Sequence, residues 1–207
     1  MQAAALSLET NKGNEPMHLD GLKVAVLVTD GYEPSELTEP MRALRDSGAD
    51  VTIVSDHDGK INGKTDADTA TVDLTLDVAR PDDYGALLLP GGVKNPDTMR
   101  QNQRGVTFVR SFFDSGKPIA AICHAPWLLI EAGVVRDRRV TSYPSLRTDL
   151  RNAGAEWVDE EVVVDQGMVT SRSPKDLAAF NAKMLEEFAE GTHSRRGTAA
   201  AASATAV

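Results

Sequence analysis

The stretch KPIAAICHAPWLLIEAG, residues 117–133, predicts a buried strand that turns directly into a helix. The apolar run 119–122 is typical of a strand covered on both faces, and Gly133 ends the helical pattern. Between them stands Cys123, with the small residues Ala121 and Ala125 two positions away on either side. This spacing is typical of a nucleophile elbow, a tight strand-to-helix turn that presents a reactive side chain. The alternative is a structural thiol, because free cysteine is among the most buried residue types.

Strands and helices alternate along the rest of the chain. Apolar runs predict strands, and amphipathic stretches with Gly or Pro at their ends predict helices. A polar excursion with short alternating pieces lies at 56–84, and a hairpin at 160–171 turns around residues 165–167. Alternation with apolar strands predicts an α/β sandwich with a mostly parallel sheet. The further strands are expected at 23–29, 51–55, 86–92 and 138–143, and the further helices at 33–48, 95–116, 145–154 and 173–191.

Length and composition favour a single domain in a chain of 207 residues, 41% of them hydrophobic. We assign this domain to 21–190, with a flexible N-terminal tail at 1–20 and a disordered Ala/Thr-rich tail at 191–207. The net charge of −9 argues against partners that are nucleic acids or anionic membranes. A single cysteine forms no intrachain disulfide, and neither a signal peptide nor a membrane-length apolar run is recognisable. We therefore expect a cytoplasmic protein.

The carboxyl ends of the strands are where ligands bind in such folds, so the residues there are the candidates. Cys123 follows one strand, and its neighbour His124 would lower the pKa of the thiol if charged. Glu33 follows the strand at 23–29 and opens a helix, so its carboxylate is expected to face the thiol or exchange a proton with substrate. Glu36 and Glu39 are interpreted as solvated acids of the first helical turn.

Two glycines and a second histidine lie at the same predicted edge. Gly91 and Gly92 offer unobstructed backbone N–H groups for an oxyanion hole, or they form a simple turn. His57 is the alternative partner of the thiol, or a residue of a solvent loop. The nucleotide-binding patterns GxGxxG and GxxxxGK[ST], the serine elbow GxSxG, CxxC pairs and metal-ligand clusters do not occur. We predict no cofactor and no metal.

Several motifs in order resemble the PfpI-like intracellular protease branch of the ThiJ/PfpI superfamily. They are LVTD…E…ELTEP, LLLPGG…NPDTMR, GKPIAAICHAP…LLIEAG, RRVTSYPSLRTDLRNAGAEWVDEEVVVD and VTSRSPKDLAAF, which together cover nearly all of 21–190. The resemblance implies a flavodoxin-like three-layer sandwich related to class I glutamine amidotransferases. One departure is Ala125, where the family usually has glycine; a methyl group there is tolerated if the backbone keeps a negative φ.

The resemblance also implies roles for individual residues. Cys123 is then the nucleophile and His124 its catalytic neighbour. Glu33 matches the acid that contacts the cysteine, and Gly92 with the N–H of His124 matches the oxyanion hole. Asp97 matches an acidic third member that is donated to the histidine across a subunit interface, which implies at least a homodimer and up to a hexamer. Tyr143 matches a residue that lines the pocket.

These features predict a cofactor-independent, cysteine-dependent stress enzyme that attacks carbonyl groups. The expected substrates are small carbonyls or peptides and proteins, in an intracellular peptidase or in a glyoxalase or deglycase acting on methylglyoxal-type compounds and adducts. The alternative is a redox-sensing stress protein or holdase with little turnover, in which Cys123 is oxidised and Glu33 stabilises the product. A glutamine amidotransferase is disfavoured, because the late histidine of that class has no counterpart here.

Overall fold

The computed structural model describes residues 18–65 and 67–193. Most of the two predicted tails therefore lies outside the described residues. Within the described part, none of the helices is long and apolar enough to cross a membrane. The folded body begins before residue 21, because Leu19 is buried and its N–H donates to the carbonyl of Ser47. It extends past residue 190, because the N–H of His193 donates to the carbonyl of Gly116 at 2.9 Å.

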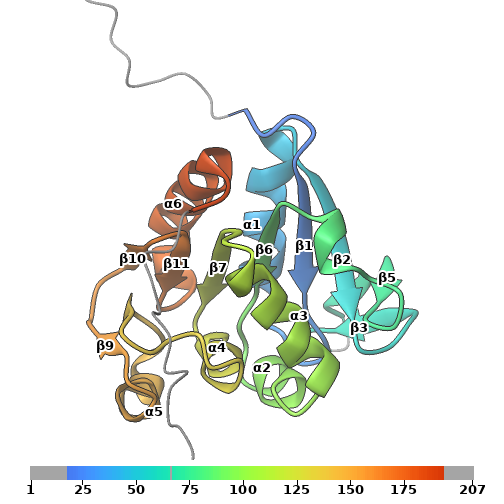
Figure 1. Cartoon of the computed structure of the whole chain (residues 1–207). Helices are drawn as coiled ribbons and strands as arrows, with labels where there is room; N and C mark the ends of the chain where they lie inside the picture. The colour runs from blue at the N-terminus through green and yellow to red at the C-terminus, as the bar shows by residue number, and fades with distance from the viewer. Residues whose placement is uncertain (1–17, 66, 194–207) are drawn as a thin grey trace, which may run out of the picture.

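A seven-stranded sheet in the order β10-β11-β7-β6-β1-β2-β5 forms the middle layer (Figure 1). Neighbouring strands in it run parallel except β10 and β11, which form the predicted antiparallel hairpin. The mostly parallel α/β sheet predicted from the sequence is thus confirmed. Its strands are β1 (Lys23–Leu27), β2 (Asp50–Ser55), β5 (Leu74–Thr75), β6 (Ala86–Leu89), β7 (Ile119–Ile122), β10 (Val162–Asp165) and β11 (Met168–Ser171).

Helices cover both faces of this sheet and complete three layers (Figure 1). Alternating residues of β1 enter two separate cores: Val24 and Val26 pack in one, Ala25 and Leu27 in the other. This alternation follows from the two-residue period of a strand, and it explains why the strand is apolar throughout. The first core is closed by α1 (Pro34–Asp46) and α6 (Leu177–Glu190), the second by α2 (Lys94–Met99), α3 (Gln103–Asp114), α4 (Pro126–Glu131) and α5 (Arg147–Asn152).

Three predicted elements differ from the structure. The single helix expected at 95–116 is two helices, because the Asn102 side chain accepts hydrogen bonds from the N–H groups of Arg104 and Gly105 and starts α3 anew. The strand expected at 138–143 shrinks to β8 (Arg139–Val140), which pairs with β9 (Glu156–Trp157) outside the main sheet. The helix expected at 173–191 is divided as well: a 3-10 turn, Pro174–Asp176, precedes α6.

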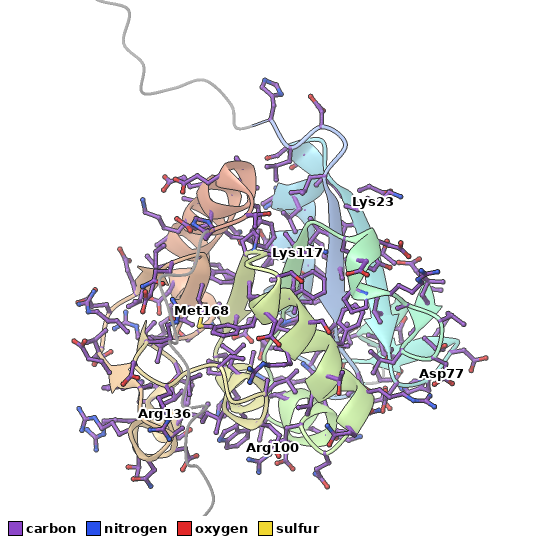
Figure 2. All side chains as sticks on the ribbon, in the orientation of Figure 1. Lys23, Asp77, Arg100, Lys117, Arg136 and Met168 are labelled. Carbon is purple, nitrogen blue, oxygen red and sulfur yellow. The ribbon has the colours of Figure 1, made fainter. Side chains whose placement is uncertain are left out.

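The polar excursion at 56–84 contains a small antiparallel pair, then β5, which joins the main sheet parallel to β2, and then a short 3-10 turn. β3 (Lys60–Asn62) pairs with β4 (Thr69–Thr71), and the 3-10 turn is Pro81–Asp83. The remaining 3-10 turn, Pro144–Leu146, precedes α5. The parallel strands β1, β6, β7 and β11 all end at one edge of the sheet. Lys23, at the start of β1, and Arg100, just after α2, lie at opposite ends of the molecule (Figure 2).

Candidate active site

Cys123 stands at the end of β7 in a left-handed backbone conformation, with φ of 65°. Such a φ costs an L-residue about 1 kcal/mol, so the surroundings must hold it in place. They do so on both sides of the residue. Its N–H donates to the carbonyl of Ser171 at 3.0 Å, and its carbonyl accepts the N–H of Tyr143 at 2.9 Å. The predicted nucleophile elbow is therefore present. Only 7% of the residue is exposed.

Ala125 lies two residues after Cys123 in this turn, at the position where glycine was expected from the family resemblance. Its φ of −54° and ψ of −31° are helical, so the methyl group causes no backbone strain. The side chain is buried in the core beneath α4. Alanine was expected to be tolerated here if the backbone kept a negative φ, and it does.

Gly91 and Gly92, after β6, approach the elbow so closely that a side chain has no room at either position. A Cβ on Gly91 would lie 2.6 Å from the Cβ of Cys123 and would also collide with the Glu36 carboxylate. Gly92 has a φ of 84°, and a Cβ there would lie 2.8 Å from the backbone nitrogen of Glu33. The absence of side chains lets the backbone of this loop lie directly against the reactive group.

Two backbone N–H groups are directed at the sulfur, those of Gly92 and His124, and both lower the pKa of the thiol. Three stronger effects oppose them: burial, the negative charge of Glu36 and the hydrogen bond between the thiol and Glu36. Burial raises the pKa of Cys123 most, followed by the negative charge of Glu36, and the net shift is upward. Convergent N–H donors beside a nucleophile are what an oxyanion hole requires, and that role for Gly92 and His124 stays a prediction.

Glu36 is the carboxylic acid beside the thiol. Its side chain extends from α1 into the core and is completely buried. Neither carboxyl oxygen meets a partner at full hydrogen-bond geometry, although the thiol and the N–H groups of Gly91 and Gly92 face it and lower its pKa in part. Desolvation dominates and raises the pKa of Glu36 from 4.5 to about 7. At neutral pH this group is able both to give and to take a proton.

The sequence prediction chose the wrong glutamate for this position. Glu33 precedes α1, and its carboxylate forms an ion pair with Lys64 rather than facing the thiol. Glu36, which was interpreted as a solvated acid, lies on the buried stripe of α1 with Leu37, Met41 and other apolar residues. The helical periodicity of α1 could have identified Glu36, because it places this acid on the apolar stripe that faces the core. Burying an acid there is costly and indicates a function. Lys64, the ion-pair partner of Glu33, also had no predicted role.

His124 connects the thiol to the protein surface. Its Nδ1 lies 3.2 Å from the Sγ of Cys123, and its Nε2 lies 3.2 Å from the Oγ of Ser145. The ring is stacked on Tyr143, with centroids 4.7 Å apart, and is tilted against Trp127 at 5.2 Å. Burial lowers the pKa of His124, so the imidazole is neutral near pH 7. A neutral ring can accept the thiol proton.

Asp97 and His57, two other candidates, have partners of their own in this chain. Asp97 is half-exposed on α2 and accepts from the Arg100 guanidinium at 2.9 Å. Arg100 in turn lies over the ring of Trp127, 4.9 Å from its centroid. His57 lies 3.8 Å from the Asp30 carboxylate, and its Nδ1 is 2.9 Å from the carbonyl of Asp58. A donation of Asp97 to a second subunit remains a prediction.

A buried amide holds the glycine loop in place. The Asn95 side chain donates to the carbonyls of Pro90 and Gly91, at 2.9 and 3.0 Å, and accepts the N–H of Thr29 at 2.8 Å. These three hydrogen bonds tie the loop after β6 to the end of β1. They fix the direction of the Gly92 N–H, and sequence reasoning had assigned no role to this asparagine.

Tyr143 lines a cavity of about 560 Å³ beside the site, together with Asp159, Arg172, Lys175 and other residues of this edge. Its side chain is 42% exposed. The residues that line this cavity include neither Cys123 nor Gly92, so the role of Tyr143 in a substrate pocket stays a prediction. A single trio in the described part of the chain has the spacing for a metal ion: Glu187, Glu190 and His193, at the end of α6. This trio shares no residue with the thiol site.

Residues 22–187 match the family model described as the DJ-1/PfpI family. The chain is 47% identical over 165 residues to protein/nucleic acid deglycase 2 of Escherichia coli K12, covering 79% of this chain and 95% of that protein. It is 45% identical over 159 residues to deglycase PfpI of Pyrococcus furiosus, covering 77% and 95%. The crystal structure of Drosophila melanogaster DJ-1beta superposes with a TM-score of 0.75 at 30% identity, covering 81% of this chain and 90% of that one. The chain therefore belongs to the DJ-1/PfpI family.

Proposed function

We propose that this chain is a cofactor-independent deglycase and glyoxalase in which Cys123 attacks the carbonyl carbon of methylglyoxal or of its adducts. The observation that carries the proposal is the position of the Cys123 sulfur. It lies in reach of a neutral imidazole, a buried carboxyl group with a pKa of about 7, and two convergent N–H donors. The deglycase relatives from E. coli and P. furiosus support the same chemistry.

The first step forms a carbon–sulfur bond. His124 takes the thiol proton at Nδ1, and the sulfur adds to the aldehyde carbon of the substrate. The carbonyl oxygen becomes an alkoxide that faces the N–H groups of Gly92 and His124, and protonation then gives a hemithioacetal. With an amine adduct the sulfur displaces the amine instead. The carbon–nitrogen bond breaks, the amine leaves with a proton, and the same hemithioacetal results.

The second step moves a proton between neighbouring carbons. Glu36 takes the proton from the carbon bound to sulfur and returns it to the adjacent carbon. The hydroxyl proton moves from the oxygen of the first carbon to the oxygen of the second, and the hemithioacetal becomes a thioester. Water then hydrolyses the thioester to the 2-hydroxy acid and the free thiol. The sum is methylglyoxal and water giving lactate, with no external oxidant or reductant.

The same geometry fits peptide hydrolysis and redox sensing less well than it fits the proposed reaction. A peptidase would use the same nucleophile and oxyanion donors, with His124 protonating the leaving amine. It would make no use of the buried Glu36 for transfer between carbons. Redox-sensing thiols are exposed and have a low pKa, whereas Cys123 is buried and burial raises its pKa.

The test measures lactate from methylglyoxal, and amine release from preformed methylglyoxal adducts of N-acetyl-arginine and of a guanine nucleotide. The nucleotide arm is included because the E. coli relative is named for both protein and nucleic acid. Wild-type protein is expected to release amine faster than the adduct decomposes alone, and Cys123→Ala is expected to be inactive. Turnover by Cys123→Ala would contradict the proposal. Cleavage of a fluorogenic peptide without lactate formation would favour the peptidase instead.

A further inference from the structure

Both ring nitrogens of His124 have partners within one chain. Nδ1 faces the Cys123 sulfur, and Nε2 lies 3.2 Å from the hydroxyl oxygen of Ser145. Ser145 belongs to the 3-10 turn Pro144–Leu146, directly after Tyr143, whose ring is stacked on the imidazole. Tyr143 and the turn that follows it therefore supply two contacts to one ring, a flat surface and a hydroxyl group. No local pattern in the sequence distinguishes Ser145.

The protonation of the ring follows from the reaction that we assign to it. A neutral imidazole carries one proton, on one of its two nitrogens. If His124 takes the thiol proton at Nδ1, its own proton must be on Nε2, where it needs an acceptor. Ser145 provides the oxygen. We propose that Ser145 is a positioning residue that holds His124 in the tautomer protonated at Nε2 and leaves Nδ1 free toward Cys123; this rests on the proposed function.

A hydroxyl group suits this position better than a carboxylate would. Among the described residues, the ionisable groups around the ring are the phenol of the stacked Tyr143, the Cys123 thiol with Glu36 beyond it and, across Trp127, Arg100 and Asp149. Burial lowers the pKa of His124. A neutral acceptor leaves that pKa low, so the ring stays unprotonated at Nδ1 near neutral pH. A carboxylate in its place would raise the pKa and make the ring cationic before the reaction.

The experiment uses Ser145→Ala, Ser145→Thr and Ser145→Asp in the full chain. Ser145 is exposed, so these changes leave the core intact. Ser115→Ala is the matched control, because Ser115 is also exposed and bonds only the carbonyl of Ser111 at the end of α3. Each protein is compared by the pH profile of lactate formation, and by ¹⁵N NMR of the His124 ring, which reports the tautomer without any turnover.

We expect the wild-type ring to carry its proton on Nε2, and Ser145→Ala to mix the two tautomers. Loss of this hydrogen bond should lower kcat by about five-fold with KM nearly unchanged, and threonine should restore it to within about two-fold. Ser145→Asp should shift the acid limb of the pH profile to higher pH, because the carboxylate raises the pKa of the imidazole. Ser115→Ala should match the wild type.

Two results would overturn the proposal. One is a wild-type ring protonated on Nδ1. The other is a Ser145→Ala protein with the wild-type tautomer and pH profile. If the wild-type protein forms no lactate, the proposed function fails, and the NMR arm still decides on Ser145. If Cys123→Ala is inactive while Ser145→Ala behaves as the wild type, the proposed function stands and Ser145 has no positioning role.

Discussion

The Glu36 carboxyl group and the Cys123 thiol lie together in the protein interior, where they influence each other's protons. The ionised carboxylate raises the pKa of the thiol, whereas contact with the thiol holds the pKa of Glu36 below what burial alone would give. Two negative charges at this spot repel each other, so the two groups titrate as a pair. When Glu36 is protonated, this repulsion disappears and the thiolate becomes easier to form.

Replacing Glu36 with glutamine should change how stability depends on pH. The folded-state pKa of about 7 exceeds the ordinary 4.5, so the native protein holds the proton more tightly than the unfolded chain. Its free energy of unfolding must then fall as pH rises from 4.5 to 7, in total by ~3 kcal/mol. Glu36→Gln removes this slope, so the variant should be more stable than the wild type at pH 8.

Thermal unfolding of both proteins at pH 5 and pH 8 measures this difference. Glu39→Gln is the control, because Glu39 is a half-exposed acid of the same helix that pairs with Arg42. It should retain the wild-type slope. Equal slopes for the wild type and Glu36→Gln would show that Glu36 is not the titrating group. Because Glu36 is placed in the proton transfer, the more stable variant should also lose lactate formation.

Gly91→Ala tests how closely the glycine loop must approach the elbow. The added Cβ would lie 2.6 Å from the Cβ of Cys123, so the loop must move away. We expect a loss of about 2 kcal/mol in stability and a fall in kcat of at least ten-fold, because the oxyanion donors move with the loop. Gly59→Ala is the control: a Cβ there meets no atom within 4 Å, and only its φ of 84° is strained. That variant should lose about 1 kcal/mol and keep its activity.

The left-handed backbone of Cys123 should affect the free energy of unfolding of two inactive variants differently. Glycine adopts a φ of 65° without strain, whereas alanine does not. We expect Cys123→Gly to be more stable than Cys123→Ala by about 1 kcal/mol, despite the extra methyl that alanine buries. Urea unfolding of the two proteins checks this. The opposite order would mean that the elbow relaxes to a negative φ once the thiol is gone.

Mixing two inactive variants tests whether Asp97 acts across a subunit interface. Such a donation is the alternative to the Ser145 proposal, because Nε2 of His124 already faces Ser145 within its own chain. If Asp97 of one copy serves the His124 of another, each variant is inactive alone, and a mixed dimer of Cys123→Ala and Asp97→Ala has one complete site. Random assembly would then restore about a quarter of the wild-type activity. Unfolding and refolding the two proteins together, with lactate formation as the readout, measures this. Additive activity of the separate variants, with no gain on mixing, would contradict donation between subunits.

The sequence was sufficient for features that depend on local pattern. The apolar run of β1 and the small residues around Cys123 indicated a buried strand and a tight elbow, and both are present. The break between α2 and α3 was missed although Asn102 marks it, because the amphipathic pattern continues on both sides. A capping side chain there outweighs the periodicity.

The site required knowledge of contacts between distant segments. Glu33 and Glu36 differ by three positions, and only the rotation of α1 decides which carboxyl group enters the core. Ser145 follows His124 by 21 positions, and Asn95 and Thr29 are 66 apart. No local pattern predicts that such side chains meet. The exact docking of α1 and of the 3-10 turn at Pro144–Leu146 determines it.

The hydrogen bond from the Cys123 N–H to the Ser171 carbonyl has a consequence for biosynthesis. β7 lies between β6, made earlier, and β11, made later. When Cys123 leaves the ribosome, β11, which holds this residue in its left-handed conformation, has not yet been synthesised. The left-handed backbone of Cys123 and its hydrogen bond to Ser171 can therefore form only after β11 has docked, late in the synthesis of the domain.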